Sequence, residues 1–165
     1  MKRILQTILP VTAIIFLFSS CYPPMRTAQS VAGPPRDGFT GTWTLTAVTY
    51  TNLADDAVPT AFDQAPPKDF TGSTWQLNKD GSGSFTLANG TIQNIYWSVN
   101  GGDALGAMFT FKKINKGQNP DEVPSGYQLV ISNNSSISMT LKTLVYLGNK
   151  NGYVVYTFNK VKAGS

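Results

Sequence analysis

The residue with the most distinctive chemistry in this sequence is Cys21, the only cysteine among 165 residues. It lies behind a run, residues 8–18, that is apolar apart from Thr12. That run is shorter than the roughly 20 residues of a membrane-spanning helix and has the length of a secretory signal core. A basic start and two serines before the cysteine complete the pattern, so we expect residues 1–20 to be a removed leader. An exported chain with one cysteine has no disulfide partner for it, and an exposed free thiol is a liability.

The segment Leu17-Phe18-Ser19-Ser20-Cys21 resembles the lipobox of bacterial lipoproteins, with Phe18 where that motif usually has leucine. The resemblance implies that the Cys21 sulfur carries a diacylglyceryl group and that two or more acyl chains hold the protein on a bilayer. Tyr22 follows the cysteine in place of the aspartate that commonly retains lipoproteins at the inner membrane. The resemblance therefore implies the outer membrane and leaves the side open. The alternative is an ordinary secretory signal with a stray thiol.

The remaining inventory offers little catalytic chemistry. The chain has no histidine, which is the commonest general base and metal ligand, and Glu122 is its only glutamate. Of the 13 basic residues, Lys2 and Arg3 lie in the leader, so the mature chain would carry 11 basic and 9 acidic side chains. No basic cluster is interleaved with aromatic residues, which argues against nucleic-acid binding. We therefore expect no enzyme, catalytic residue, metal site or cofactor.

The elements that would position any site begin after residue 38. Residues 21–38 are rich in proline and lack hydrophobic periodicity, so we expect a tether that carries the acylated Cys21. Residues 39–165 form the predicted domain, in which polar and apolar residues alternate with the period of a strand. Turn-forming clusters separate eight predicted strands: 42–50, 74–78, 84–87, 91–99, 107–114, 127–132, 137–147 and 153–161. We expect an all-β fold, an eight-stranded antiparallel up-and-down barrel in which closure removes the exposed edges.

Gly41-Thr42-Trp43 opens the first predicted strand, and a Gly-x-Trp at this place is the fingerprint of lipocalins. Over residues 39–161 the chain resembles the lipocalin-like lipoproteins of Bacteroidetes-type bacteria, through the segments 39–45, 70–77, 83–87 and 95–99. The resemblance implies a lipocalin-like barrel whose closed end is plugged by Trp43. Lipocalins pack a late arginine on that tryptophan; this chain has none after Arg36, and Lys160 or Lys162 would have to replace it. A generic eight-stranded sandwich or barrel is the alternative.

If Trp43 faces inward, alternation places its strand neighbours Leu45 and Ala47 inward too. The same rule turns Leu77, Ile95, Leu129, Ile131, Leu141 and Phe158 inward. The expected ligand-binding residues are Trp43, Leu45, Trp75, Trp97, Phe109, Phe111, Met139 and Tyr156. An eight-stranded barrel is just wide enough to hold one small ligand or to be filled by its own side chains, and both remain open.

Three polar groupings in the connections have ordinary interpretations. Asn78 and Asp80 are spaced like early ligands of a calcium loop, but the segment lacks the later glutamate and flanking helices, so we expect a hairpin turn. The long connection 51–72 falls where lipocalins have their lid, and its four aspartates are expected to be solvated rather than to bind a cation. The cluster Lys112, Lys113 and Lys116 is expected to be a solvated turn.

Two functions of different classes follow. The first is a membrane-anchored lipocalin-like lipoprotein that binds a small hydrophobic ligand at the cell envelope. The second is a non-catalytic accessory subunit of an outer-membrane protein complex, which a filled interior would suit. The expected partners are therefore a membrane through the lipid anchor, a small apolar ligand and outer-membrane proteins.

Overall fold

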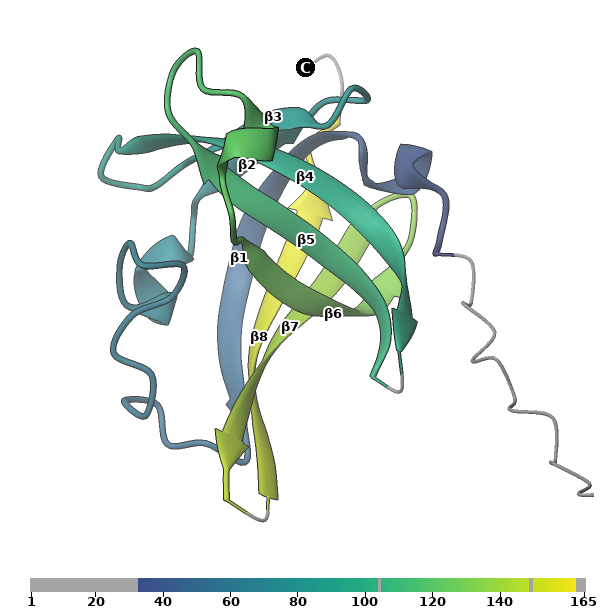
Figure 1. Cartoon of the computed structure of the whole chain (residues 1–165). Helices are drawn as coiled ribbons and strands as arrows, with labels where there is room; N and C mark the ends of the chain where they lie inside the picture. The colour runs from purple at the N-terminus through teal and green to yellow at the C-terminus, as the bar shows by residue number, and fades with distance from the viewer. Residues whose placement is uncertain (1–32, 104, 149, 163–165) are drawn as a thin grey trace, which may run out of the picture.

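The structure is a computed structural model that describes residues 33–103, 105–148 and 150–162. Cys21, the leader and most of the tether lie outside the described residues. Eight antiparallel strands follow one another around a closed barrel, and β8 pairs with β1 (Figure 1). The strands are β1 (Gly41–Thr51), β2 (Thr74–Leu77), β3 (Ser82–Thr86), β4 (Ile92–Asp103), β5 (Gly106–Ile114), β6 (Tyr127–Asn134), β7 (Ser138–Leu147) and β8 (Lys150–Lys160).

The predicted fold is confirmed, and each predicted strand is present. Three short 3₁₀ turns accompany the strands: η1 (Arg36–Phe39), η2 (Pro67–Phe70) and η3 (Pro120–Glu122). Within the described ranges there is no α-helix, and hence none long and apolar enough to cross a membrane.

The barrel has two different ends. The closed end holds η1, the start of β1 and the end of β8 (Figure 1). The β2–β3, β4–β5 and β6–β7 turns are at the same end. At the other end, which we call the mouth, lie the β3–β4 and β7–β8 turns and the two long connections, 52–73 and 115–126. The connection 52–73, here called the lid, runs beside the part of β1 that the short strand β2 leaves unpaired.

A β-bulge in β1 corrects one sequence expectation. Trp43 and Leu45 point inward, but the pairing of β1 with β8 shifts between Leu45 and Ala47. One extra residue reverses the alternation, so that Val48 rather than Ala47 packs against the core. The prediction that Ala47 faces inward is therefore wrong.

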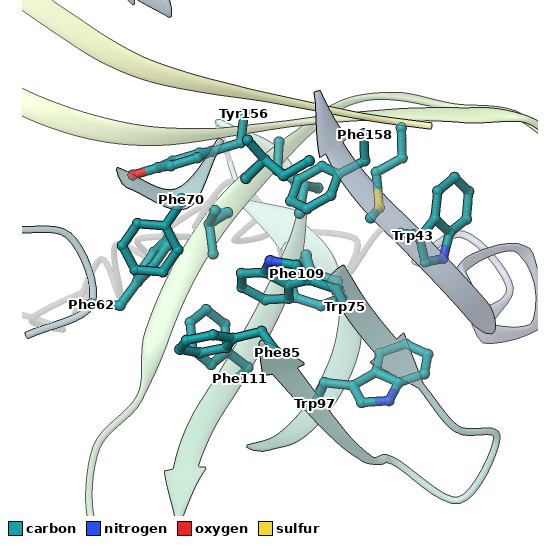
Figure 2. Close-up of a cluster of buried hydrophobic side chains, with 14 of the residues drawn as sticks. Trp43, Phe62, Phe70, Trp75, Phe85, Trp97, Phe109, Phe111, Tyr156 and Phe158 are labelled. Carbon is teal, nitrogen blue, oxygen red and sulfur yellow. The ribbon is translucent and has the colours of Figure 1, made fainter. Parts of the chain in front are cut away.

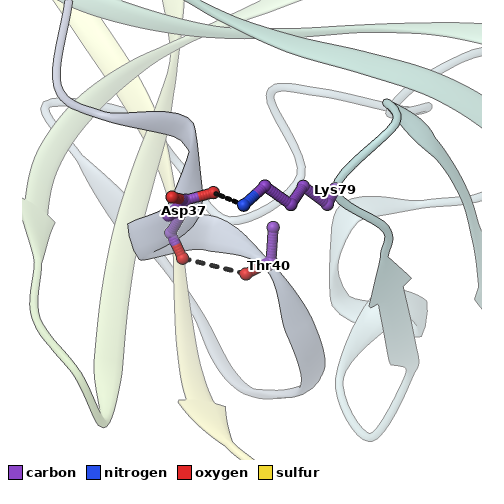
Figure 3. A network of polar contacts seen from close by, with 3 residues as sticks. All are labelled: Asp37, Thr40 and Lys79. Carbon is purple, nitrogen blue, oxygen red and sulfur yellow. Dashed lines mark hydrogen bonds and ion pairs between the residues drawn. The ribbon is translucent and has the colours of Figure 1, made fainter.

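Ion pairing contributes little to holding the closed end together. The Lys79 ammonium lies 3.4 Å from the Asp37 carboxylate, which links the β2–β3 turn to η1 (Figure 3). Thr40, which follows η1, donates a hydrogen bond of 2.9 Å from Oγ1 to the Asp37 carbonyl. The side chains of Lys79 and Asp37 are 81% and 70% exposed, and exposed pairs contribute about 0–1 kcal/mol. The buried aromatic core must therefore supply most of the stability.

Candidate functional site

The eight side chains expected to bind a ligand all lie inside the barrel. Their exposed fractions do not exceed 2%. Figure 2 shows that the tryptophan, phenylalanine and tyrosine rings among them project into one shared interior from several strands. These eight are Trp43, Leu45, Trp75, Trp97, Phe109, Phe111, Met139 and Tyr156.

Contacts between rings occupy the space beside these residues. In the middle of the barrel, Trp75 stacks on Phe85 with ring centroids 4.9 Å apart, and Phe111 meets Trp75 edge-on at 5.5 Å. Toward the closed end, Trp97 stacks on Phe109 at 5.7 Å. Rings in contact at these distances fill the space between them. In this conformation the residues form a filled core, and a ligand reaches them only if something at one end moves.

The closed end is sealed around Trp43. Its Nε1–H donates to the Phe39 carbonyl at 2.8 Å, so the buried indole is satisfied by the backbone of η1. The Lys160 ammonium lies 5.1 Å from the Trp43 ring centroid, in cation–π range. Of the two lysines that the sequence offers in place of an arginine, Lys160 therefore takes that position. Arg36 similarly covers Trp97 at 4.7 Å and donates to its carbonyl oxygen.

The mouth is plugged by Phe62, a lid residue that the sequence analysis did not single out. The Phe62 side chain is only 6% exposed, and its ring contacts Phe70, Trp75, Phe111, Tyr127 and Tyr156 at centroid distances of 5.1–6.2 Å. Its backbone is left-handed, with φ 54°, which costs about 1–2 kcal/mol for an ordinary residue. Burying a phenylalanine contributes about 1.5–3 kcal/mol, and each ring pair adds to that. Burial therefore outweighs the strain and keeps the lid closed.

A polar latch holds the same turn of the lid. The Lys113 ammonium donates to the Phe62 carbonyl at 3.2 Å, to the Asp63 carbonyl at 3.1 Å and to Gln64 Oε1 at 3.2 Å. The Tyr127 hydroxyl donates to the Asp63 carboxylate at 2.8 Å. The expectation that Lys113 belongs to a solvated turn is wrong, because it ends the inward-facing row of β5. Asp63 likewise accepts a hydrogen bond from the barrel wall.

The pKa values of two tyrosines at the mouth, Tyr127 and Tyr156, are raised above the usual value. Burial, followed by the hydrogen bond to Asp63 and that residue's negative charge, raises the pKa of Tyr127 to about 12. Burial also raises the pKa of Tyr156 far above its usual value. Both hydroxyls therefore stay protonated at neutral pH, and that of Tyr127 donates to Asp63.

A cleft of about 260 Å³ opens at the mouth between the lid and strands β6, β7 and β8. We call it the mouth cleft. Of the eight expected ligand-binding residues, only Tyr156 lines it. The sequence analysis missed Tyr127, Thr143 and Val154, although each has the inward parity of its strand. The cleft is lined by apolar residues (Val58, Ala61, Phe62, Gly126, Val154) and by residues with polar groups (Thr60, Tyr127, Gln128, Thr143, Tyr156).

The segment that resembles a calcium loop is a hairpin turn, as expected. Asp80 Oδ1 accepts hydrogen bonds from the backbone N–H and the hydroxyl of Ser82, at 2.9 and 2.7 Å. These bonds lower the pKa of the Asp80 carboxyl. In the described part of the chain, no three aspartate, glutamate, histidine or cysteine side chains gather closely enough to hold a metal ion.

Comparison with known protein families finds none that matches the chain, and a search of curated proteins finds none with significant similarity.

Proposed function

We propose that this protein is a lipid-anchored barrel of the bacterial cell envelope that binds a small, mostly apolar ligand in the mouth cleft. The observation that carries the proposal is the cleft itself, the place where the barrel interior meets the lid. The proposal moves the ligand from the eight filled core positions to the mouth, and of those eight it keeps Tyr156 as a contact. It assigns no reaction and no cofactor to the chain.

The lining of the cleft defines the kind of ligand. Phe62 and Val154 supply apolar contact, and the hydroxyls of Thr60, Thr143 and Tyr156 supply polar groups to fix an orientation. A volume of about 260 Å³ is slightly below the roughly 300–1,000 Å³ of ordinary ligand pockets. The ligand is therefore either small or long enough to displace Phe62 and enter the barrel.

An uncharged apolar fluorophore, N-phenyl-1-naphthylamine, tests the binding site. The chain from residue 21 onward with Cys21→Ser keeps every strand of the barrel and lacks both the leader and any acyl chain. We expect saturable fluorescence enhancement with this form and tighter binding with Phe62→Ala, which enlarges the cleft. Thr143→Phe should abolish binding because its ring fills the cleft.

Thr140→Phe is the matched control, because Thr140 lies on the same strand between the inward-facing Met139 and Leu141 and so faces outward. Equal binding losses in Thr140→Phe and Thr143→Phe would refute the site. So would a chain that fails to bind the probe even with Phe62→Ala.

The anchor is tested separately. We expect Cys21→Ser in the full chain to move the protein out of the membrane fraction, and mass spectrometry of the wild-type N-terminal peptide to show the acyl mass on Cys21. A serine variant that still sediments with the outer membrane would contradict the anchor and leave the cleft unaffected.

The packed core supports a second candidate, the non-catalytic subunit of an outer-membrane complex. The eight inward residues first expected to bind a ligand are at most 2% exposed, so this part of the interior is committed to stability and the outer surface is left for partners. Detergent extraction of the acylated protein distinguishes the two candidates. A subunit co-purifies with the same membrane proteins in fixed ratio, and a ligand carrier releases a small molecule in native mass spectra.

A further inference from the structure

The closed end carries an exposed apolar groove that the ligand-binding proposal does not use. It lies between the start of β1, the β6–β7 turn and the end of β8, and encloses about 720 Å³. We call it the closed-end groove. Ile137 is 70% exposed there and Val161 46% exposed, although both are apolar. The two side chains line the same groove and give it a small exposed apolar surface.

The charge around this groove has one sign. Lys160 and Lys162 line it, and no aspartate or glutamate is among its lining residues. Lys162 is exposed at the rim, and the aliphatic stem of Lys160 crosses Gly41 on its way to Trp43. An apolar surface edged by lysines complements the interfacial region of a membrane that contains anionic lipids.

The path of the chain points to the same occupant. The described residues begin at Gly33, where a Cβ would come within 2.7 Å of the Asn100 carbonyl carbon near the β4–β5 turn. The chain therefore enters the barrel at the closed end. Eleven residues separate Cys21 from Gly33, a reach of at most about 40 Å when fully extended. A surface held this close to a bilayer needs little intrinsic affinity, because the tether gives it a high effective concentration.

We propose that the closed-end groove rests on anionic lipid headgroups, with Ile137 and Val161 inserted at the interface and Lys162 facing phosphate. The inference rests on the proposed lipid anchor, which brings the groove to the membrane. The contacts with lipid are made by the groove residues and do not involve the acyl chains. Its structural consequence is that the mouth, at the opposite end of the barrel, faces away from the membrane.

Vesicle co-sedimentation tests this contact without the anchor, using the chain from residue 21 onward with Cys21→Ser. At low salt we expect it to bind vesicles of phosphatidylglycerol and not vesicles of phosphatidylcholine. A lysine near an anionic surface contributes about a fivefold change in partitioning, so Lys162→Glu should weaken binding by more than that. Ile137→Ser should weaken it by about fivefold as well, because the inserted apolar side chain is lost.

Matched controls exist at the mouth. Ile92 is 67% exposed, and Lys150 is also exposed, in the β7–β8 hairpin. Ile92→Ser and Lys150→Glu make the same chemical changes at the far end and should leave vesicle binding unchanged. Binding that falls equally in the controls would show nonspecific attraction and overturn the proposal.

Two further outcomes would also overturn it. One is no sedimentation with phosphatidylglycerol vesicles; the other is a dimer that Ile137→Ser dissociates, which would make a second copy the occupant. This form has no acyl chain, so the two proposals can fail separately. If it binds vesicles but Cys21 is not acylated in cells, only the anchor is refuted. Acylation without vesicle binding refutes only this surface.

Discussion

At the scale of single residues, Gly41 and Trp43 act as one unit with Lys160. Gly41 has a backbone φ of +120°, which residues other than glycine rarely adopt. A Cβ at this position would lie 2.9 Å from Lys160 Cε, in the stem that carries the ammonium to the Trp43 ring. The glycine of the Gly-x-Trp motif therefore serves both the backbone turn and the passage of the lysine over the tryptophan.

Gly41→Ala is expected to destabilise the protein by about 1–3 kcal/mol, because it combines backbone strain with displacement of Lys160. Urea unfolding followed by tryptophan fluorescence measures the loss. Gly90→Ala is the control, because Gly90 also has positive φ (+85°) but a Cβ added there would meet nothing within 4 Å. Equal losses in the two variants would mean that the lysine stem is not a constraint.

Tyr127 gives the mouth a pH dependence. Its folded-state pKa of about 12 is above the value of 10.0 for an unperturbed tyrosine. The unfolded chain therefore loses this proton first, so the contribution of Tyr127 is complete below pH 10 and is lost as pH rises toward 12. We expect the free energy of unfolding to fall between about pH 10 and pH 12, and to fall less steeply in Tyr127→Phe. An unchanged slope in that variant would contradict the assignment.

At the scale of elements, two adjacent lysines of β5 attach connections at the mouth to the barrel wall. Lys113, at the mouth end of β5, makes three hydrogen bonds to residues 62–64 of the lid. Its neighbour Lys112 faces the other way and donates to the Pro120 carbonyl at 3.0 Å. Adjacent lysines of one strand therefore hold two different connections at the mouth.

Lys113→Met should loosen the lid without unfolding the barrel, because it removes the three Lys113 hydrogen bonds of the latch and retains an apolar stem. Hydrogen exchange checks this: amides of residues 60–65 should exchange at least about tenfold faster, on the order of one lost charged hydrogen bond, and those of β8 should not change. Lys112→Met provides the comparison and should leave lid exchange unaltered. A uniform increase across the barrel would point to global destabilisation instead.

The strands could be predicted from the sequence, and several contacts at the mouth could not. Alternation locates all eight strands because apolar inward residues alternate with mostly polar outward ones. It fails at Ala47, where a bulge adds a residue that no local pattern reveals. It also gives no information on Phe62, because a lid without periodicity does not show which residue turns inward. Lys113 shares the parity of the inward residues Phe109 and Phe111, but its charge led to the expectation of a solvated turn.

At the scale of the whole molecule, one chain of ring contacts connects the two ends of the barrel. It runs from Phe39 through Phe109 and Phe111 to Phe62 and Tyr156 at the mouth, with centroid separations of 5.1–6.4 Å. No described strand has a core of its own, because every inward side chain packs against those of other strands. The barrel should therefore gain or lose its structure as a unit.

We accordingly expect a single cooperative unfolding transition. Trp43, Trp75 and Trp97 are at most 2% exposed and lie on three different strands, so their fluorescence reports on most of the barrel. The urea transition followed by tryptophan fluorescence should coincide with the transition followed by far-ultraviolet circular dichroism. Closure requires β1 to pair with β8, as in Trp43 with Lys160, and such distant pairing predicts refolding in milliseconds to seconds. Because the side chain of Lys113 bonds the lid and not a neighbouring strand, Lys113→Met should preserve the coincidence. Separate fluorescence and dichroism midpoints in the wild-type chain would show that one part of the barrel is stable alone, which a shared core forbids.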